Sequence, residues 1–256
     1  LLPRNLCFAI IDVVFYCDEW KGDVARIIMY MYLRYPSHDL HVYGPKGIKE
    51  FIMLQMKLSK SWIDFNLIFH ELTSLESVLI FEDDKIEVHT IPLDHRVYTN
   101  GFLFKEKAFD RKLLVDRAEA KHIDVAYYRK LKQGTDVLNS HGKLISNADV
   151  TTEGIPSKSY AFCSDTAYCE AIIPIIKNVD VLYHEATFLD AHANLCAKTK
   201  HSTAKQAAEI AKKSTVGKLI LGHYSSRYNN LEDFKTEAQT VFSCVELAED
   251  GKTFQI

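Results

Sequence analysis

Carboxylate and histidine side chains stand next to apolar runs in the second half of the chain. In order they are Asp165, Glu185 (directly after His184), His201 and His223. Apolar runs that end in polar residues, with helical patterns between them, are typical of α/β proteins that present side chains at the carboxyl ends of their strands. Histidine and carboxylate groups gathered from several strand ends are common ligands of zinc and related metals. The sequence therefore indicates a metal site first of all.

The hydrophobic pattern predicts the elements that position these residues. Apolar runs over residues 160–164, 179–184 and 217–222 predict three buried strands, and the apolar face of residues 204–211 predicts a helix. Elsewhere the patterns predict strands over residues 6–16, 40–43, 62–70, 77–81, 85–91 and 101–104, helices over 24–35, 47–57, 116–121 and 231–241, a basic and aromatic connection over 127–136, a turn over 139–142, and a terminal hairpin over 243–247 and 252–256.

This order of elements suits one α/β architecture. Strands come first, strands and helices then alternate, and a hairpin closes the chain. Such a pattern favours an αββα sandwich, in which two mixed β-sheets are flanked by helices. No repeat, low-complexity segment or linker marks a boundary, so we expect a single domain over residues 1–256.

Composition narrows the class of protein. The chain has 256 residues, of which 47% are hydrophobic and 25% are charged, as in ordinary soluble globular proteins. No apolar run approaches the ~20 residues of a membrane span, and the first residues lack the pattern of a signal peptide. Six cysteines without a CxxC pair indicate reduced core thiols and a cytoplasmic location. With a net charge of −3, any RNA contact is expected from local clusters such as residues 129–132.

Several motifs, in order and with matching gaps, resemble the ribonuclease Z family, the transfer-RNA 3′-processing branch of the metallo-β-lactamase fold. The resemblance covers roughly residues 40 to 256, and each motif by itself is weak. The motifs are Val42-Tyr-Gly-Pro-Lys-Gly-Ile48, Pro92-Leu-Asp-His95 with Gly101-Phe102, Lys130-Leu-Lys-Gln-Gly134, Phe162-Cys-Ser-Asp-Thr166, His184-Glu-Ala-Thr-Phe188, His201-Ser-Thr203 and Leu221-Gly-His-Tyr-Ser-Ser-Arg-Tyr228.

The resemblance implies a hydrolase that cleaves precursor tRNA with zinc-activated water. His95 would bind one zinc, His223 the other, and Asp165 would bridge them, because two cations stabilise the attacking and the leaving oxygen of a phosphodiester. His201 would donate a proton or hydrogen bond to the leaving group, and Glu185 would orient that histidine.

The resemblance also implies contacts to the substrate and to a second subunit. Ser225, Ser226 and Arg227 are suited to phosphate contacts. Family members are usually homodimers in which a substrate-gripping segment of one subunit serves the other's site. The chain shows no long Gly/Pro-rich arm of that kind, and no membrane partner is expected.

The sequence departs from the family at the main metal motif, His-x-His-x-Asp-His. Near the expected place stands Lys21-Gly-Asp-Val24, with no histidine within ten residues on either side. Three remaining ligands cannot hold two zinc ions with ordinary coordination. Two zinc ions per subunit would therefore require further ligands. Either residues are missing from this region of the sequence, or the chain is a homologue that has lost half of its metal site. The intact downstream ligands favour omission.

Simpler interpretations stay open for each residue. Asp165 could cap a helix that begins near Thr166, His223 could be a satisfied core histidine, and His201 could merely precede a helix capped by Ser202 or Thr203. His184 is interpreted as structural, and the basic residues 129–132 as a solvated face more often than an RNA contact. Two rival functions follow: another phosphodiesterase of the same fold, or a non-catalytic RNA-binding homologue with a broken metal site.

Overall fold

The computed structural model describes residues 8–10, 39–60 and 65–256, and the chain forms two compact units. The first comprises Leu1–Ile80, His89–Leu103 and Tyr160–Ile256, and the second comprises Phe81–Val88 and Phe104–Ser159. The expectation that residues 1–256 form a single domain is not tested by this division into units and stays a prediction. The predicted helix over 24–35, the Lys21–Val24 segment and most of the predicted 6–16 strand region lie outside the described residues.

A seven-stranded sheet places the chemistry-bearing residues of the first unit. Its four strands β11 to β14 pair in parallel, with Cys163 beside His184 and Glu185 beside Gly222. Their carboxyl ends therefore lie at one edge of the sheet. The strand order is β14-β13-β12-β11-β6-β5-β4, with bounds β4 Leu79–Glu82, β5 Ile86–Pro92, β6 Asn100–Glu106, β11 Ser159–Cys163, β12 Val181–Glu185, β13 Lys218–Gly222 and β14 Val245–Leu247.

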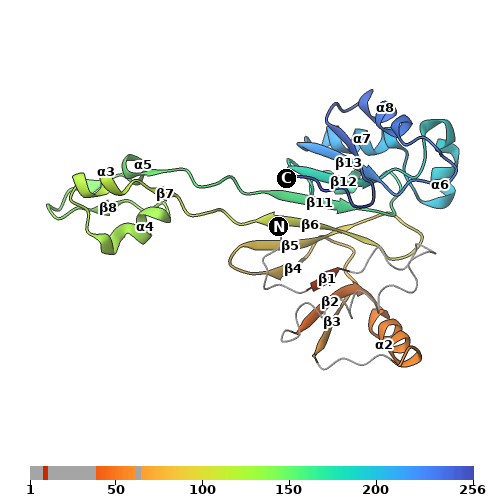
Figure 1. Cartoon of the computed structure of the whole chain (residues 1–256), viewed down its shortest axis with the longest axis horizontal. Coiled ribbons are helices and arrows are strands. Elements are labelled where there is room, and N and C mark those ends of the chain that lie inside the picture. The colour runs from red at the N-terminus through yellow and green to blue at the C-terminus, as the bar shows by residue number, and fades with distance from the viewer. Residues whose placement is uncertain (1–7, 11–38, 61–64) are drawn as a thin grey trace. The chain divides into compact units, whose positions relative to one another are not determined.

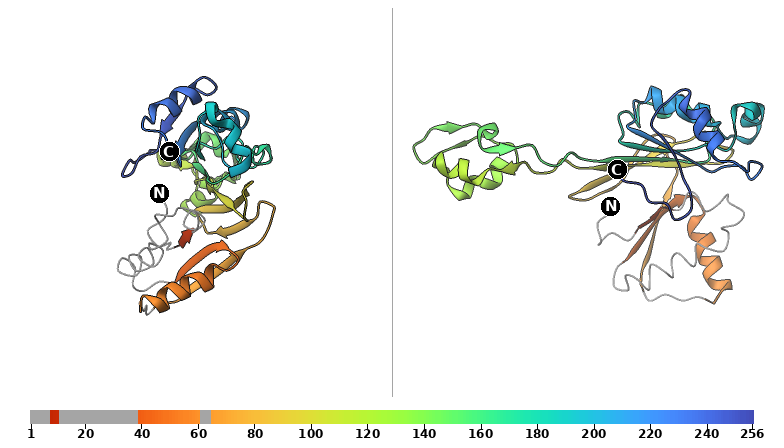
Figure 2. Two further views of the ribbon diagram at one scale, coloured as in Figure 1. Left: turned by 90° about the vertical axis from the view of Figure 1, so that its right-hand side faces the viewer. Right: turned by 45° about the horizontal axis from the view of Figure 1, so that its top comes forward.

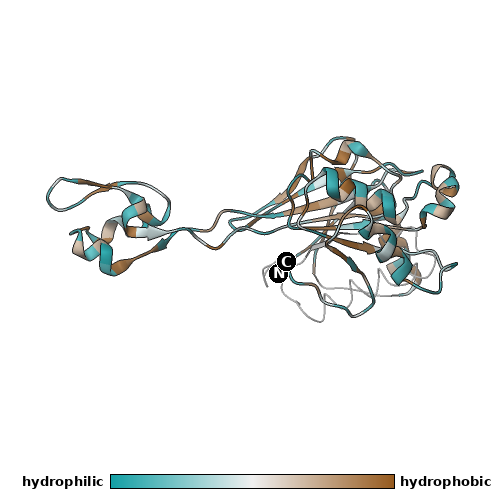
Figure 3. Ribbon diagram, turned by 90° about the horizontal axis from the view of Figure 1, so that it is seen from above, coloured by the Kyte–Doolittle hydropathy of each residue, from teal (hydrophilic) through white to brown (hydrophobic). Residues whose placement is uncertain are grey.

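Two helices, α7 (Ala204–Lys213) and α8 (Glu232–Gln239), cover one face of this sheet (Figure 1). The ribbons of both helices carry teal and brown segments, which reflects one polar and one apolar side (Figure 3). Thr203 caps α7 in a capping box with Gln206, as the sequence allowed. The buried face of α7 is built mainly from small side chains, so the helix can approach the sheet closely: Ala204, Ala207, Ala208, Ile210 and Ala211. Short helices η3 (Glu170–Ile172), η4 (Asp190–Leu195) and α6 (Cys196–Thr199) lie in the connections.

A second sheet of the first unit joins strands β1 (Phe8–Ile10), β2 (Leu40–Pro45) and β3 (Leu67–Leu72) in parallel. Helix α2 (Ile48–Leu58) runs beside it (Figure 2). The helix buries one residue per turn, so its apolar spacing fits the predicted amphipathic helix. The core between them contains Leu40, Val42, Ile48, Ile52 and Met56.

The second unit has a small core of its own. The predicted helix over 116–121 appears as α3, and the predicted turn over 139–142 joins β8 and β9. The predicted basic and aromatic connection over 127–136 contains the short helix α4, which buries Leu131. The elements are β7 Lys112–Leu113, α3 Val115–Ala120, η2 Val125–Tyr127, α4 Tyr128–Lys132, β8 Val137–Leu138, β9 Leu144–Ile145, α5 Asn147–Val150 and β10 Thr151–Thr152, around Ala118, Ile123, Leu131, Val137, Ile145 and Val150.

The predicted terminal hairpin is also corrected. Residues 245–247 form β14, which pairs in parallel with β13, whereas residues 252–256 form no strand. Because β14 pairs with β13 in the large sheet, the residues after the turn around Gly251 do not pair with β14. Within the described ranges, no helix is both long and apolar enough to cross a bilayer.

Candidate metal centre

Asp165, His201 and His223 meet at the carboxyl edge of the parallel strands. Each offers one ligand atom, and these atoms all lie within 4.8 Å of one another. Asp165 Oδ1 lies 3.3 Å from His223 Nε2, and Asp165 is only 5% exposed. A buried carboxylate needs a cationic or hydrogen-bonding partner, which imidazoles or a metal ion can provide. The geometry therefore adds His201, expected from the sequence as a proton donor, to the two expected ligands Asp165 and His223.

The backbone turns sharply at two of these residues. Asp165 has φ 55° and His223 has φ 58°, both in the left-handed region that few side chains adopt. Such conformations gather at functional sites, where the surrounding structure holds them. At Gly222, the residue before His223, a Cβ atom would collide with the Tyr183 side chain, so glycine lets that ring approach the strand end. No helix begins at Thr166, so the alternative that Asp165 is a helix cap is wrong.

Glu185, fully buried at the end of β12, connects the histidines. Its Oε1 accepts from His201 Nδ1 at 2.7 Å and from the backbone N–H of Thr166 at 3.0 Å. Its Oε2 accepts from the Thr187 hydroxyl at 2.7 Å and from the Thr187 backbone N–H at 2.9 Å. Four donors compensate for the burial of this carboxylate.

The Glu185–His201 pair shifts the acidity of both partners. Burial by itself would raise the pKa of Glu185, but the hydrogen bond and charge of His201, the charge of His223 and the Thr187 hydroxyl together lower it below its ordinary value. Burial by itself would lower the pKa of His201, but the hydrogen bond and charge of Glu185, with the charge of Asp165, raise it. Each charge therefore favours the ionised form of the other.

His223 is held on both sides of its ring. Nδ1 lies 2.9 Å from Thr187 Oγ1, while Nε2 faces Asp165. Its ring stacks on that of His201 with centroids 5.2 Å apart. The side chain is 28% exposed, so His223 lies at the edge of the site and not inside the core.

His95 lies in the loop between β5 and β6. Its ring centroid lies 5.3 Å from that of His201, but His95 is outside the group formed by Asp165, His201 and His223. His95 Nδ1 lies 3.0 Å from the carbonyl oxygen of Lys200, and Lys200 Nζ lies 2.9 Å from both carboxylate oxygens of Asp94. These two links hold the His95 loop against the segment that carries His201.

The residues expected to contact phosphate lie near His201 and the Phe188 ring. Arg227 is exposed, and its guanidinium lies 5.1 Å above the Phe188 ring, whose centroid is 6.4 Å from that of His201. Arg227 Nε donates to Ser225 Oγ at 3.2 Å, and Ser226 is exposed. A solvent-facing guanidinium beside the site can bind an anion from outside.

His184, interpreted from the sequence as structural, is fully buried, and its Nδ1 lies 2.7 Å from the Glu185 carbonyl oxygen. Burial lowers its pKa, so it is neutral. The residues that sequence reasoning missed are Thr187 and Lys200, which contact His223 and His95. Thr166, which donates to Glu185, and Asp94, which pairs with Lys200, were missed as well. Their one signal in the sequence is their place next to predicted ligands.

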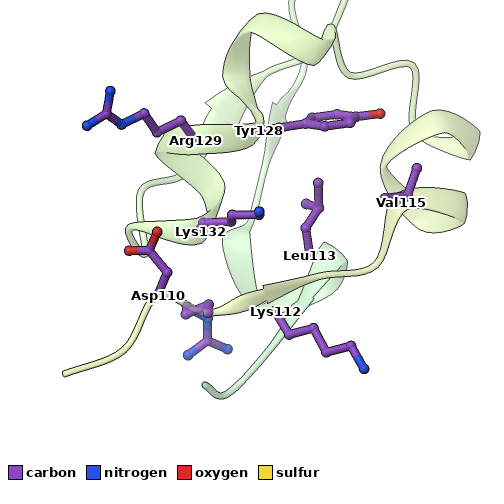
Figure 4. Close-up of a pocket in the computed structure, with 8 residues that line it drawn as sticks. Asp110, Lys112, Leu113, Val115, Tyr128, Arg129 and Lys132 are labelled. Atoms are coloured by element: carbon purple, nitrogen blue, oxygen red, sulfur yellow. The ribbon is translucent and has the colours of Figure 1, made fainter. Parts of the chain in front are cut away.

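A basic pocket of about 490 Å³ lies within the second unit (Figure 4). Tyr128, Arg129 and Lys132 come from α4, and Lys112 comes from β7. Four basic side chains against one acid give a positive surface that includes part of the basic cluster expected from the sequence. The lining residues are Asp110, Arg111, Lys112, Leu113, Val115, Tyr128, Arg129 and Lys132.

No family model matches the chain. Ribonuclease Z of Cytophaga hutchinsonii is 41% identical over 241 residues, which cover 93% of this chain and 76% of that protein. Ribonuclease Z of Porphyromonas gingivalis is 40% identical over 203 residues, with 79% and 67% covered.

Solved structures share the fold. The short form of human tRNase Z has a TM-score of 0.63 at 20% identity, with 99% of this chain and 80% of that chain covered. The metallo-β-lactamase fold protein YhfI from Bacillus subtilis has a TM-score of 0.60 at 16% identity, with 98% and 78% covered. The expected α/β class, with mixed sheets flanked by helices, is therefore confirmed.

Proposed function

The chain belongs to the ribonuclease Z family, and on that premise we propose that it is a zinc-dependent endoribonuclease that removes the 3′ trailer from precursor tRNA. The observation that carries the proposal is the meeting of Asp165, Glu185, His201 and His223, from separate segments of the chain, at one sheet edge. A cytoplasmic homodimer, as the resemblance implies, is part of the proposal.

The donor set fits zinc. The Asp165 carboxylate and the His223 imidazole are ligands that zinc prefers, and they leave positions open, as in catalytic sites. His223 engages Nδ1 elsewhere and can offer Nε2 to zinc, whereas His201, held through Nδ1, keeps Nε2 free to carry a proton. His95, whose ring centroid lies 5.3 Å from that of His201, is the expected ligand of a second ion. A bound zinc would supply a Lewis acid that activates water and stabilises charge on phosphate oxygens.

The chain's own residues supply the proton and the grip on the substrate. His201, protonated more readily because of Glu185, is placed to donate a proton to the leaving 3′ oxygen. Glu185 holds that ring in one orientation through the 2.7 Å bond to Nδ1. Arg227, with Ser225 and Ser226, would contact the phosphates on either side of the cut.

The basic pocket of the second unit supports RNA as the substrate. Arg111, Lys112, Arg129 and Lys132 can pair with backbone phosphates, and the Tyr128 ring offers a surface for a base. Such contacts read charge and shape, so they suit binding of an RNA whose sequence varies.

The test compares two substrates under the same conditions. Purified protein with added zinc is incubated with a precursor tRNA that carries a 3′ trailer and, separately, with a small chromogenic phosphodiester. We expect one cut in the precursor that leaves a 3′ hydroxyl, with little turnover of the small diester. His201→Gln should slow the cut about 10²–10⁴-fold. His89→Gln, which changes a histidine outside the site, is the matched control.

Each rival function predicts a different result. Comparable turnover of both substrates would indicate a general phosphodiesterase of the same fold. Tight binding of precursor tRNA without zinc uptake and without cleavage would indicate a non-catalytic RNA-binding homologue, and the proposal would be withdrawn.

A further inference from the structure

Thr187 stands between the buried carboxylate and the second histidine. It follows β12 by two residues and is 7% exposed. Its hydroxyl lies 2.7 Å from Glu185 Oε2 and 2.9 Å from His223 Nδ1. Its carbonyl oxygen also accepts from the backbone N–H of Ser225 at 3.1 Å. Both its side chain and its backbone therefore contact the segment that carries His223.

Counting protons sets the direction of these bonds. An ionised carboxylate only accepts, and a hydroxyl has one proton to donate. The Thr187 proton goes to Glu185, because that contact is shorter than the 3.1 Å to the His223 carbonyl oxygen. The hydroxyl lone pairs then accept from Nδ1–H of His223. The ring is thereby held with a proton on Nδ1, which leaves Nε2, the atom that faces Asp165, as the atom available to a metal ion.

We propose that Thr187 is a positioning residue that links His223 to Glu185, so that one buried carboxylate orients both histidines of the site. Glu185 holds His201 directly and His223 through the Thr187 hydroxyl. As a consequence, both rings are held through Nδ1. The role toward zinc rests on the proposed function, whereas the tautomer of His223 does not.

Two substitutions separate the hydroxyl from the shape of the side chain. Thr187→Val keeps the shape and removes the hydroxyl, and Thr187→Ser keeps the hydroxyl and removes the methyl group. Imidazole ¹⁵N NMR of the metal-free protein reports the tautomer of His223, and competition with a chelator reports the zinc affinity. Thr187→Ala is a second hydroxyl-free variant, to be used if the valine variant does not fold.

We expect the serine variant to match the wild type in both measurements. The valine variant should lose the single Nδ1–H tautomer and bind zinc about 10–100-fold more weakly, the usual cost of losing a partner behind a metal ligand. A valine variant that keeps the Nδ1–H tautomer overturns the proposal for Thr187. If the wild type binds no zinc, the metal-dependent function fails, and the tautomer measurement still decides the role of Thr187.

Discussion

His201 Nδ1 lies 2.7 Å from Oε1 of Glu185, a carboxylate with no exposed surface. The two residues are held by different elements, because Glu185 ends β12 and His201 precedes the capped start of α7. The bond orients the imidazole and stabilises its protonated form. An oriented, protonated histidine beside a carboxylate and a second histidine is suited to proton donation.

Replacing His201 should remove catalysis more than binding. We expect His201→Gln to lower kcat about 10²–10⁴-fold, the usual contribution of a general acid, with a small change in KM for precursor tRNA. Because His201 is also a candidate ligand, zinc uptake is measured on the same sample. Loss of zinc together with activity would mean that His201 acts as a ligand, and an unchanged kcat would contradict both roles.

The free energy of unfolding of the metal-free protein should be greatest between the two shifted pKa values. The pKa of Glu185 is lowered from 4.5, so its contribution is complete above 4.5 and is lost as the pH falls through the lowered value. The pKa of His201 is raised from 6.5, so its contribution is complete below 6.5 and is lost as the pH rises through the raised value.

Urea unfolding with a zinc chelator, at a series of pH values, measures this profile. Glu185→Gln should lower the maximum by about 1–3 kcal/mol and flatten the curve around it, because a buried hydrogen-bonded charge is lost. A variant that unfolds with the wild-type dependence on pH would show that the pair contributes nothing to stability.

Exchanging the charges of Asp94 and Lys200 tests the link that holds the His95 loop. Lys200 has φ 61°, a conformation that Asp tolerates better than most residues. Because the pair is partly exposed, each single reversal should cost only about 1 kcal/mol, and the double variant Asp94→Lys with Lys200→Asp should recover most of it. Equilibrium unfolding of the four proteins gives the coupling, and strictly additive effects would argue against an ion pair.

Removing charge from the second unit should weaken RNA binding without changing the chemistry. Arg129→Ala with Lys132→Ala should raise KM for precursor tRNA and reduce the slope of log affinity against log salt by about one for each lost phosphate contact. Turnover at saturating substrate should stay the same. Lys143→Ala, outside the pocket, is the control, and an equal effect of that change would indicate a diffuse charge effect only.

The cysteines should differ in reactivity. Burial raises the pKa of Cys163 strongly and that of Cys196 to about 11, whereas Cys244 is exposed. Alkylation of the folded protein near pH 8, mapped by mass spectrometry, should therefore label Cys244 before Cys163 and Cys196, because the thiolate is the reactive form. Early labelling of Cys163 would mean that the core around β11 opens readily.

The sequence by itself determined the elements that carry the site. The runs before Asp165, His184 and His223 form β11, β12 and β13, because short continuous apolar runs are typical of parallel strands that are buried on both faces. The alanine-rich stretch after His201 forms α7 at the predicted place. Local pattern was enough here, since each element is specified by neighbours in the chain.

Tertiary structure decided which polar atoms meet. Thr187 and Lys200 carry no pattern that marks them, because their contacts to His223 and His95 join residues 36 and 105 positions apart in the sequence. The prediction of a terminal hairpin was wrong for the same reason, since β14 pairs with β13 and not with the residues that follow β14. Parallel packing brings the strand ends together, and only that packing shows that Glu185 serves His201 directly and contacts His223 through Thr187.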